Sequence, residues 1–425
     1  MSDTLRIGFI STRLAGTDGV SLETAKWATV LRRMGHQVFY CAGEQEDDGP
    51  PGLLIPEAHF RHPENEWINA HAFGCESRSA GLKSRIEGMA TSLRAGLRKF
   101  IEQFGIDLII AENALTIPMQ LPLGLAITDL IEEAGIPAIA HHHDFYWERE
   151  RFRVNCVGDV LARAFPPDLP TLRHVVINSI AQRELKRRRG LDSLIVPNVF
   201  DFDTPAPGVD EFNADLRAAI GLDGDDLFVL QPTRVVPRKG IELAIELLQR
   251  LDEVAGKHPV LIITHRAGDE GLDYLHKLQS LARQEDVDLR YLAARFDTVR
   301  HVEPDGRKVY ALWDAYVHAD FVTYPSLNEG FGNALIETVY FRKPALVNRY
   351  PVYAADIEPL GFDFVDIAGT VTDMAVEGVR RLLTDPAQRC TAVEQNYRLG
   401  QEHFSYEVLQ EKLVALLNGL GLHGG

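Results

Sequence analysis

Two carboxylates and a glycine-rich turn occur together between Pro325 and Glu337, in the string Pro-Ser-x-x-Glu-Gly-Phe-Gly-x-x-x-x-Glu. Glu329 and Glu337 are about two helical turns apart, so they would line one side if both were helical. Backbone N–H groups at a helix N-terminus carry partial positive charge and attract anions. We therefore expect a diphosphate here, with one glutamate for the hydroxyls of a transferred group and the other for a ribose. An isolated pair of glutamates at this spacing would more often face solvent.

The elements around this string are expected to place it at the end of a strand. Phe321–Tyr324 is a short apolar run that predicts a buried strand, and Ser326 and Asn328 can cap the helix that follows. The first turns of that helix would offer backbone N–H groups to a diphosphate. The expected contacts are Gly330, Phe331 and Gly332.

A second charged pair, Arg234 and Lys239, lies on the loop after a predicted strand, Leu227–Gln231. The loop ends at Gly240, before a predicted helix over Ile241–Leu251. Two cations just ahead of a helix N-terminus can clamp a diphosphate. Exposed lysines and arginines are common, so a solvated loop is the alternative.

Three consecutive histidines, His141 to His143, and then Asp144 follow the predicted strand Ala138–His141. Ligands of α/β folds bind at the carboxyl ends of parallel strands, so this is a place for a binding site. Adjacent histidines point in different directions, and no further His or Cys with ligand spacing follows, which argues against zinc. We expect no metal, and a cluster of structural histidines under a loop stays an open interpretation.

An arginine-rich segment comes next, with Arg149, Arg151 and Arg153 close to three aromatic residues. Arginine favours bidentate contacts with phosphate or carboxylate, so Arg149 and Arg151, together with Asp144, are candidates for binding an anionic acceptor. A helix that pairs these arginines with the intervening glutamates is an equally good interpretation.

The composition excludes several classes of function. The chain has 425 residues, 44 of them basic and 61 acidic, and a formal net charge of −17. This argues against nucleic acid and against an anionic bilayer as the main partner. The four cysteines form no C-x-x-C pair and indicate reduced thiols. The sequence shows no signal peptide and no apolar run of about 18 residues, so we expect a cytoplasmic protein without a transmembrane segment.

Strands and helices alternate through both halves, which predicts an α/β fold with parallel sheets. The first loop carries Gly16 and Gly19, where a Rossmann-like turn would hold phosphate, although plain turn glycines are the alternative. We expect three parts: a first Rossmann-like domain over residues 1–203, a second over 204–400, and a C-terminal helix over 401–425.

These strings, in this order, resemble the retaining glycosyltransferases of family 4, which have the GT-B fold. The Pro-Ser-x-x-Glu string resembles their nucleotide-sugar signature, and the loop with Arg234, Lys239 and Gly240 matches their Arg-x4-Lys-Gly. The resemblance covers nearly the whole chain and implies two Rossmann-like domains that face each other across a cleft. One departure lies at 264–268, where relatives normally have glycines.

The resemblance also implies roles for the candidate residues in the transfer of a hexose from a nucleotide sugar with retention. The departing diphosphate would be stabilised by Arg234, Lys239 and amides near Gly330, as preorganised donors should do. Glu329 would hold sugar hydroxyls and Glu337 the ribose. His143 would contact the transferred sugar, and Gly19 the diphosphate. No divalent metal and no cofactor besides the donor substrate are expected.

UDP-glucose is the expected donor, with GDP-mannose next, and the acceptor is expected to be a small soluble molecule that bears phosphate or carboxylate, such as a sugar phosphate or a glycerate derivative. A nucleotide-sugar epimerase or a phosphorylase on the same fold stays open, because a fold does not determine function. A non-catalytic nucleotide-sugar-binding protein stays open too. A nicotinamide dehydrogenase is disfavoured, because the first loop lacks G-x-G-x-x-G.

Overall fold

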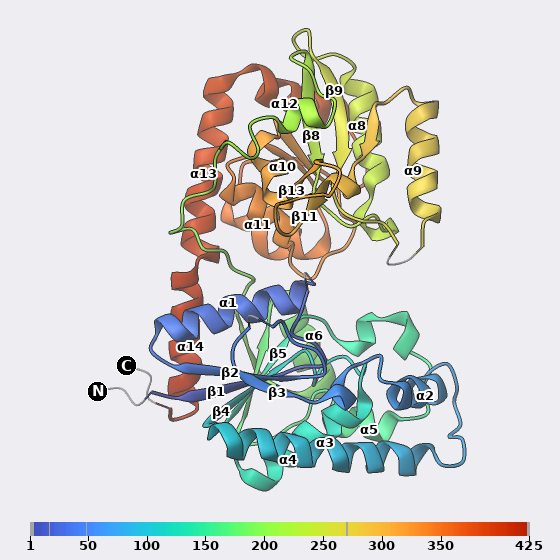
Figure 1. The fold of residues 1–425 in the computed structure, drawn as a ribbon, viewed down its shortest axis with the longest axis vertical. Coiled ribbons are helices and arrows are strands. Elements are labelled where there is room, and N and C mark those ends of the chain that lie inside the picture. Colours follow the sequence, from blue (N-terminus) through green and yellow to red (C-terminus); the bar gives the residue numbers. More distant parts are fainter. Residues whose placement is uncertain (1–3, 17, 48, 269–270, 423–425) are drawn as a thin grey trace. The chain divides into compact units, whose positions relative to one another are not determined.

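The computed structural model describes residues 4–16, 18–47, 49–268 and 271–422. It divides the chain into two compact units, labelled by element in Figure 1. Unit 1 comprises Met1–Val199 and Tyr406–Gly425, and unit 2 comprises Phe200–Ser405. The chain therefore enters unit 2 after Val199 and returns to unit 1 at Tyr406.

Unit 1 is built on a parallel sheet of seven strands, in the order β3-β2-β1-β4-β5-β6-β7. The central strands are almost entirely buried because helices cover both of their faces. This confirms the expected α/β class. The strands are β1 (Arg6–Ile10), β2 (Gln37–Ala42), β3 (Gly52–Leu54), β4 (Leu108–Glu112), β5 (Ala138–His142), β6 (Leu172–Val176) and β7 (Ser193–Ile195).

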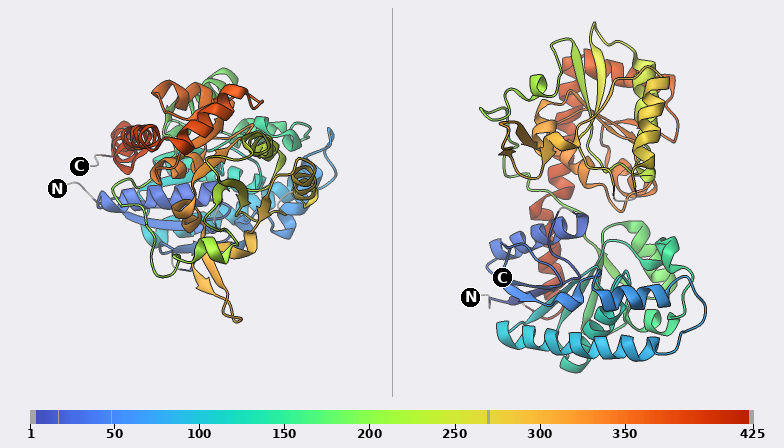
Figure 2. Two further views of the ribbon diagram at one scale, coloured as in Figure 1. Left: turned by 90° about the horizontal axis from the view of Figure 1, so that it is seen from above. Right: turned by 45° about the vertical axis from the view of Figure 1, so that its right-hand side comes forward.

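The helices of unit 1 form a layer on each side of this sheet (Figures 1 and 2). One layer packs α3 beside α4, and a Cβ atom on Gly8 of β1 would lie 2.6 Å from the Phe100 ring of α3, so the glycine permits this close packing. The other layer packs α1 beside α14 around the buried Trp27. The helices are α1 (Gly19–Arg33), α2 (Pro63–Ala72), α3 (Leu82–Phe104), α4 (Leu121–Ala134), α5 (Gly158–Ala164), α6 (Ser179–Arg189) and α14 (Tyr406–Gly419).

Unit 2 is built on a parallel sheet of six strands, in the order β10-β9-β8-β14-β15-β16. Its strands are β8 (Asp226–Gln231), β9 (His258–Ile263), β10 (Leu289–Tyr291), β14 (Phe321–Tyr324), β15 (Ala345–Asn348) and β16 (Val365–Ile367). Its helices are α7 (Leu216–Ala219), α8 (Ile241–Leu251), α9 (Asp273–Gln284), α10 (Leu312–His318), α11 (Asn333–Tyr340), α12 (Asp373–Thr384) and α13 (Pro386–Phe404).

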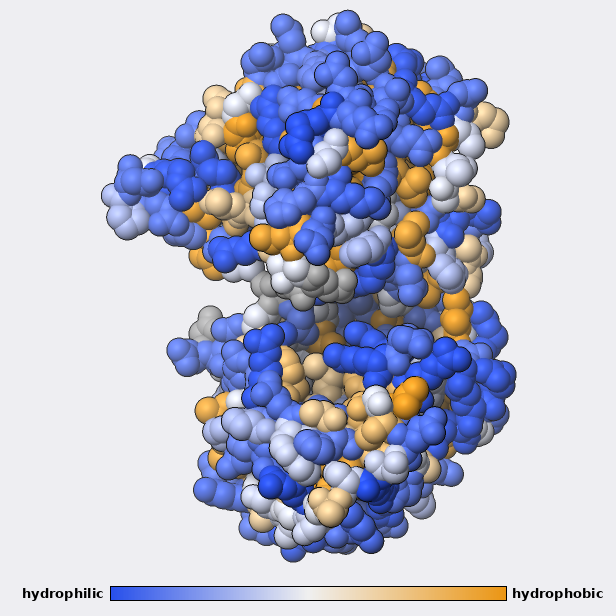
Figure 3. All heavy atoms as spheres, turned by 90° about the vertical axis from the view of Figure 1, so that its right-hand side faces the viewer, coloured by the Kyte–Doolittle hydropathy of each residue, from blue (hydrophilic) through white to orange (hydrophobic). Residues whose placement is uncertain are grey.

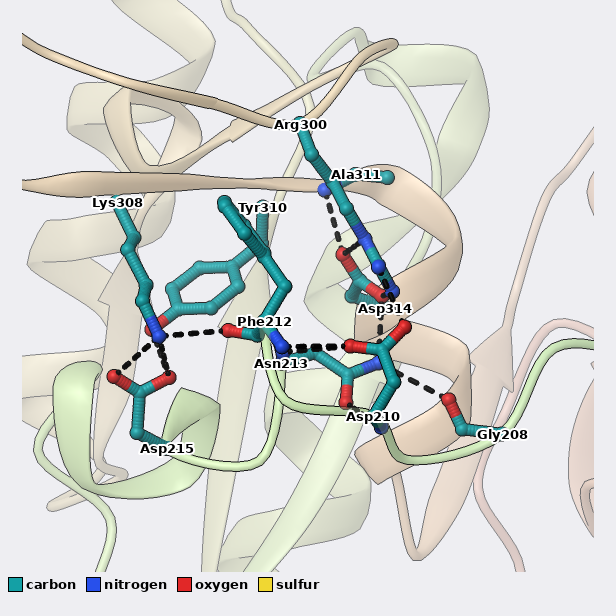
Figure 4. A network of polar contacts seen from close by, with 10 residues as sticks. All are labelled: Gly208, Asp210, Phe212, Asn213, Asp215, Arg300, Lys308, Tyr310, Ala311 and Asp314. Atoms are coloured by element: carbon teal, nitrogen blue, oxygen red, sulfur yellow. Dashed lines mark hydrogen bonds and ion pairs between the residues drawn. The ribbon is translucent and has the colours of Figure 1, made fainter.

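A small three-stranded sheet in unit 2, which the sequence patterns did not indicate, consists of β11 (Phe296–Asp297), β12 (His301–Val302) and β13 (Lys308–Ala311). A polar network next to it holds residues 208–215 in place (Figure 4). Arg300 donates to the buried carboxylate of Asp314 at 2.9 Å and to Asp210 at 2.6 Å. Asn213 donates to Asp314 at 2.8 Å. The network satisfies a buried charge, so its role is structural.

Among the described residues, no helix is long and apolar enough to cross a membrane. On the face drawn in Figure 3, hydrophilic residues prevail in both units, and apolar residues occur singly or in small groups.

Candidate active site

In unit 2, a buried cluster of charges forms where the loops after β8 and β14 meet. Lys239 ends a short 3-10 turn, Pro237–Lys239, and only 8% of it is exposed. Its Nζ donates to Oε1 of Glu329, which also accepts from the Tyr324 hydroxyl at 3.0 Å. Arg238 donates to Oε2 of Glu329 at 3.1 Å. Two of the residues singled out from the sequence, Lys239 and Glu329, thus lie in direct contact.

The two loops approach so closely that glycine is needed at Gly240. Gly240 has a φ of +57°, and a Cβ atom there would lie 2.5 Å from the carbonyl oxygen of Pro325. A larger residue would therefore push the β8 loop away from the β14 loop. This explains why a glycine directly follows Lys239, and it ties the Arg-x4-Lys-Gly string to the Glu329 string.

The prediction that a helix includes Glu329 was wrong, because the helix begins later in the chain. Helix α11 begins at Asn333, and its N-cap is Gly332 rather than Ser326 or Asn328. Glu329 therefore lies in the turn before the helix, while Glu337 lies in it, and the two do not share a helix face. The glycine-rich turn is itself well fixed, because Phe331 is buried and its carbonyl oxygen accepts from the Tyr350 hydroxyl at 2.6 Å. The exposed Gly330 and the adjoining Gly332 leave this turn without side chains, in front of the positive end of α11.

Glu337 is oriented by a hydrogen bond from a neighbouring helix. The hydroxyl of Tyr316 in α10 donates to Oε2 of Glu337 at 3.0 Å. Burial first, and the charge of Glu337 second, raise the pKa of Tyr316 well above its ordinary value, so Tyr316 stays a neutral donor. Glu337 is thus an oriented carboxylate that lies half-buried on α11.

His265 joins this part of unit 2, at the place where the sequence departs from the family's glycines. Burial and the positive charges of Lys239 and Arg234 lower its pKa to about 4, so the imidazole is neutral. Arg234 itself is exposed on the β8 loop. The departure at 264–268 therefore adds a neutral imidazole beside the two cations, which the sequence pattern alone does not indicate.

In unit 1, the candidate histidine His143 forms a cluster with a carboxylate that the sequence analysis missed. Glu112, at the end of β4, is fully buried, and its Oε2 lies 3.0 Å from Nδ1 of His141 and 3.3 Å from Nε2 of His143. The parallel register of β4 and β5 pairs Glu112 with His141, which brings these groups together. His143 reaches the rim of the cluster, with 10% of its side chain exposed.

The cluster fixes the charge of its members. Burial alone would raise the pKa of Glu112, but the charges and hydrogen bonds of His141 and His143 outweigh it and lower the pKa to about 2. Burial opposes the charged form of His143, and the hydrogen bond and charge of Glu112 prevail and raise its pKa. His141 is different, because burial dominates and lowers its pKa. Glu112 and His143 therefore form the ionised pair.

The middle histidine points to the other side of the strand, as alternation along a strand requires. His142 contacts the Thr116 hydroxyl through Nδ1, and its Nε2 lies 2.9 Å from Nδ1 of His174. Burial and nearby histidines lower its pKa well below the ordinary value. The structural interpretation of the histidine run thus fits His142, and the role of His143 stays a prediction.

The same geometry would suit a metal ion, since the ligand atoms of Glu112, His141 and His143 lie within 4.8 Å of one another. The nitrogen–oxygen distances are also those of ordinary hydrogen bonds between histidine and carboxylate. The donor set therefore fits either a shared proton network or a bound cation, and the expected absence of a metal stays a prediction.

Gly19 begins α1, directly after its N-cap residue Asp18. The Asp18 carboxylate accepts from the backbone N–H groups of Val20 at 3.1 Å and Ser21 at 3.2 Å, and it pairs with Arg13 at 2.8 Å. A side chain of the protein thus already occupies these two amides of the helix end. The expected diphosphate contact at this helix end would therefore be made by the backbone N–H group of Gly19.

The arginine-rich segment does not form a helix that pairs its arginines with glutamates throughout. It forms two 3-10 turns, Tyr146–Glu148 and Glu150–Phe152. The guanidinium of Arg149 is bound to Asp144, so these two candidates neutralise each other. Arg151 forms no ion pair with any described residue and instead lines a cavity in unit 1. Of the acceptor candidates, Arg151 is thus the one whose charge is not compensated.

Comparison with known proteins assigns the chain to a family. Residues 212–399, almost all of unit 2, match the family model described as glycosyl transferases group 1. Mannosylglucosylglycerate synthase of Thermotoga maritima is 34% identical over 450 aligned residues, which cover 96% of this chain and 99% of the relative. The enzyme of the same name from Petrotoga mobilis is 34% identical over 387 residues, covering 85% and 86%.

A solved structure confirms the fold. HepE of Anabaena, crystallised with UDP and glucose, superimposes with a TM-score of 0.67 at 14% identity, covering 98% of this chain and 100% of that one. At this identity the likeness supports the GT-B fold alone. The chain belongs to the glycosyl transferases group 1 family, as a glycosyltransferase of the GT-B fold that is homologous to the mannosylglucosylglycerate synthases.

Proposed function

We propose that the protein is a retaining hexosyltransferase that transfers a mannosyl or glucosyl group from a nucleotide sugar to a small glycoside bearing a carboxylate, with glucosylglycerate as the first candidate. The observation that carries this proposal is the cluster of Lys239, Arg238 and Glu329 in front of the positive end of α11. Both curated relatives are named for making mannosylglucosylglycerate, which supports the acceptor class. Their name also favours mannose over the glucose expected from the sequence, so a mannosyl donor comes first and UDP-glucose second.

The departing diphosphate is the group that this cluster would stabilise. Departure of a nucleoside diphosphate concentrates negative charge, and preorganised cations in a water-poor site stabilise that charge most effectively. Lys239 has three N–H donors, so it can keep its bond to Glu329 and still donate to a phosphate oxygen. Arg234 and the amides after Gly330 would add to the same stabilisation. No acid is needed to protonate such a leaving group.

The remaining candidates are assigned to the rest of the donor. Glu329 accepts hydrogen bonds from Lys239, Arg238 and Tyr324, which orient its carboxylate, and we assign this carboxylate to a sugar hydroxyl. Glu337 is assigned to the ribose. The family resemblance assigns His143 to the transferred hexose, and its Nδ1–H would be the donor because Nε2 faces Glu112.

A screen of donors against acceptors, read by mass spectrometry, tests the proposal. We expect GDP-mannose or UDP-glucose to glycosylate glucosylglycerate, with little product on neutral disaccharides. NMR of the new linkage should show the anomeric configuration of the donor. Turnover of nucleotide sugar without an acceptor would favour an epimerase, whereas tight nucleotide binding without any transfer would favour a binding protein. An inverted linkage would overturn the retaining mechanism.

We also propose that the reaction needs no divalent metal, because side chains and a helix end supply the positive charge. Full activity is therefore expected after dialysis against EDTA, with elemental analysis of the same sample to detect any ion left in the Glu112 cluster. Loss of turnover that Mg²⁺, Mn²⁺ or Zn²⁺ restores would contradict this. A Glu112→Gln variant that no longer retains the ion would then identify the cluster as its site.

A further inference from the structure

A cavity of about 420 Å³ lies entirely within unit 1. Its size falls in the range of small-molecule sites. The first wall is α2 with the loop before it, and the second follows β4, the strand that ends in Glu112. It is lined by Phe60, Arg61, Glu66, Asn69, Phe73, Met119, Arg151 and Phe152.

The cavity is preorganised by two asparagines of α2. The amide of the buried Asn65 donates to the carbonyl oxygens of Phe60 at 2.8 Å and Met119 at 2.7 Å, and that of Asn69 donates to Met119 at 2.8 Å. These bonds join the loop before α2, α2 itself and the loop after β4. The walls therefore keep their places without a ligand.

The third wall is the arginine-rich segment, which is fixed to the end of α2. The Phe73 ring meets the Phe152 ring edge-on at 4.8 Å, and the amide of Gly74 donates to the carbonyl oxygen of Val154 at 2.8 Å. The guanidinium of Arg151 lies over the Phe152 ring, 4.5 Å from its centre. Aromatic rings of this kind suit the apolar faces of a sugar.

The charges in the cavity indicate a singly charged anion. Arg61 and Arg151 form no ion pair with any described residue, and neither does Glu66, so the lining carries two positive charges and one negative. Burial and the neighbouring Arg149 lower the pKa of Arg151, and the charge of Asp144 offsets part of this effect. A net charge of +1 matches a carboxylate better than a dianionic phosphate, and arginine binds carboxylates in bidentate geometry.

We propose that this cavity is the acceptor site and that Arg61 and Arg151 bind the carboxylate of a glycerate glycoside, with the sugar ring against Phe73 and Phe152 and a hydroxyl on Glu66. This inference rests on the proposed function for the identity of the acceptor. It adds that Arg61 and Arg151 select the acceptor. Arg149 is not one of these residues, because Asp144 neutralises its charge.

The test compares glucosylglycerate with glucosylglycerol, in which a hydroxymethyl group replaces the carboxylate, and with glucose 6-phosphate. A charged hydrogen bond contributes about 1.5–3 kcal/mol, so Arg61→Gln and Arg151→Gln should each raise the KM for glucosylglycerate by about tenfold or more. The KM for glucosylglycerol, already high, should change less than twofold. The matched control is Arg153→Gln, in the same segment, where the arginine pairs with Glu150 and does not line the cavity.

Calorimetry with glucosylglycerate alone separates this inference from the proposed function. Binding by the wild type that both arginine variants weaken supports the acceptor site even if no donor is turned over. Transfer to glucosylglycerate that neither variant affects overturns the acceptor site and leaves the proposed function standing. Equal losses with glucosylglycerol, preferred use of glucose 6-phosphate, or no binding of glucosylglycerate by the wild type would each overturn it too.

Discussion

In each unit, a carboxylate of the candidate site is buried at the carboxyl edge of the sheet, but the two carboxylates have different partners. Glu112 in unit 1 lies at the end of a strand and contacts two histidines. Glu329 in unit 2 lies in a turn and contacts Lys239, Arg238 and Tyr324. Histidine changes its charge near neutral pH, whereas lysine and arginine keep theirs. The same position in two related folds therefore gives one site whose charge changes near neutral pH and one whose cations are a lysine and an arginine, although burial lowers the pKa of Lys239.

The positive charges of unit 2 are expected to matter most, so the largest effect should follow from Lys239→Ala. Removing one charge-assisted bond to the diphosphate costs about 1.5–3 kcal/mol, so kcat/KM should fall by about ten- to a hundredfold near neutral pH. The variant also leaves Glu329 short of one donor. We therefore include Lys239→Ala combined with Glu329→Gln, which should recover thermal stability without recovering activity.

Steady-state kinetics and thermal unfolding of these two variants check the prediction, with the exposed Lys257→Ala as control. If the double variant regained activity as well as stability, Lys239 would only neutralise a buried carboxylate. Its contact with Glu329 would then be structural, like that of Arg300 with Asp314.

The sequence revealed the unit 2 cluster more readily than the unit 1 cluster, for a physical reason. Lys239 and Glu329 each lie in a local string whose residue types and glycines have their own explanation, as the close approach at Gly240 shows. Glu112 lies in no string. It becomes significant only because the register of β4 and β5 sets it opposite His141.

The α/β class and the helix over Ile241–Leu251, which is α8, were predicted correctly, because apolar periodicity is a local property. The start of α11 was not predicted, since Ser326 and Asn328 are good capping residues and only tertiary contacts decide that Gly332 takes this position. The small sheet over 296–311 was missed as well, because strands of two to four residues have too little pattern.

In unit 1, we expect a smaller effect at the Glu112–His143 pair, and this effect depends on pH. Glu112 raises the pKa of His143, so the charged imidazole persists above its ordinary pKa and is lost only as pH rises through the raised value. Glu112→Gln removes the largest contribution that raises the pKa of His143, and the weaker effects of Glu23 and Asp144 stay, so this pKa should fall. The alkaline limb of kcat should move to lower pH, with a loss of about tenfold near pH 8 and a smaller loss near pH 6.

A pH profile of kcat for Glu112→Gln beside the exposed Glu102→Gln measures this effect. A uniform loss at all pH values would mean that Glu112 supports the fold and does not tune His143. The comparison also distinguishes the two units, because Lys239→Ala should leave the position of the limb unchanged.

The smallest effect is expected at Glu337, the second carboxylate of unit 2, because a ribose contact is the same in the ground state and in the transition state. Such a contact changes KM and leaves kcat alone. Glutamine can still accept from the Tyr316 hydroxyl, so Glu337→Gln should keep its orientation and raise the donor KM by about two- to tenfold. Tyr316→Phe removes the hydroxyl that orients Glu337, and it should produce a weaker change of the same kind. Calorimetry with the nucleoside diphosphate alone should show the same loss of affinity, because this ligand keeps the ribose and lacks the sugar. If Glu337→Gln lowered kcat and left nucleotide affinity intact, Glu337 would act on the transferred sugar, and the roles of Glu329 and Glu337 would be exchanged.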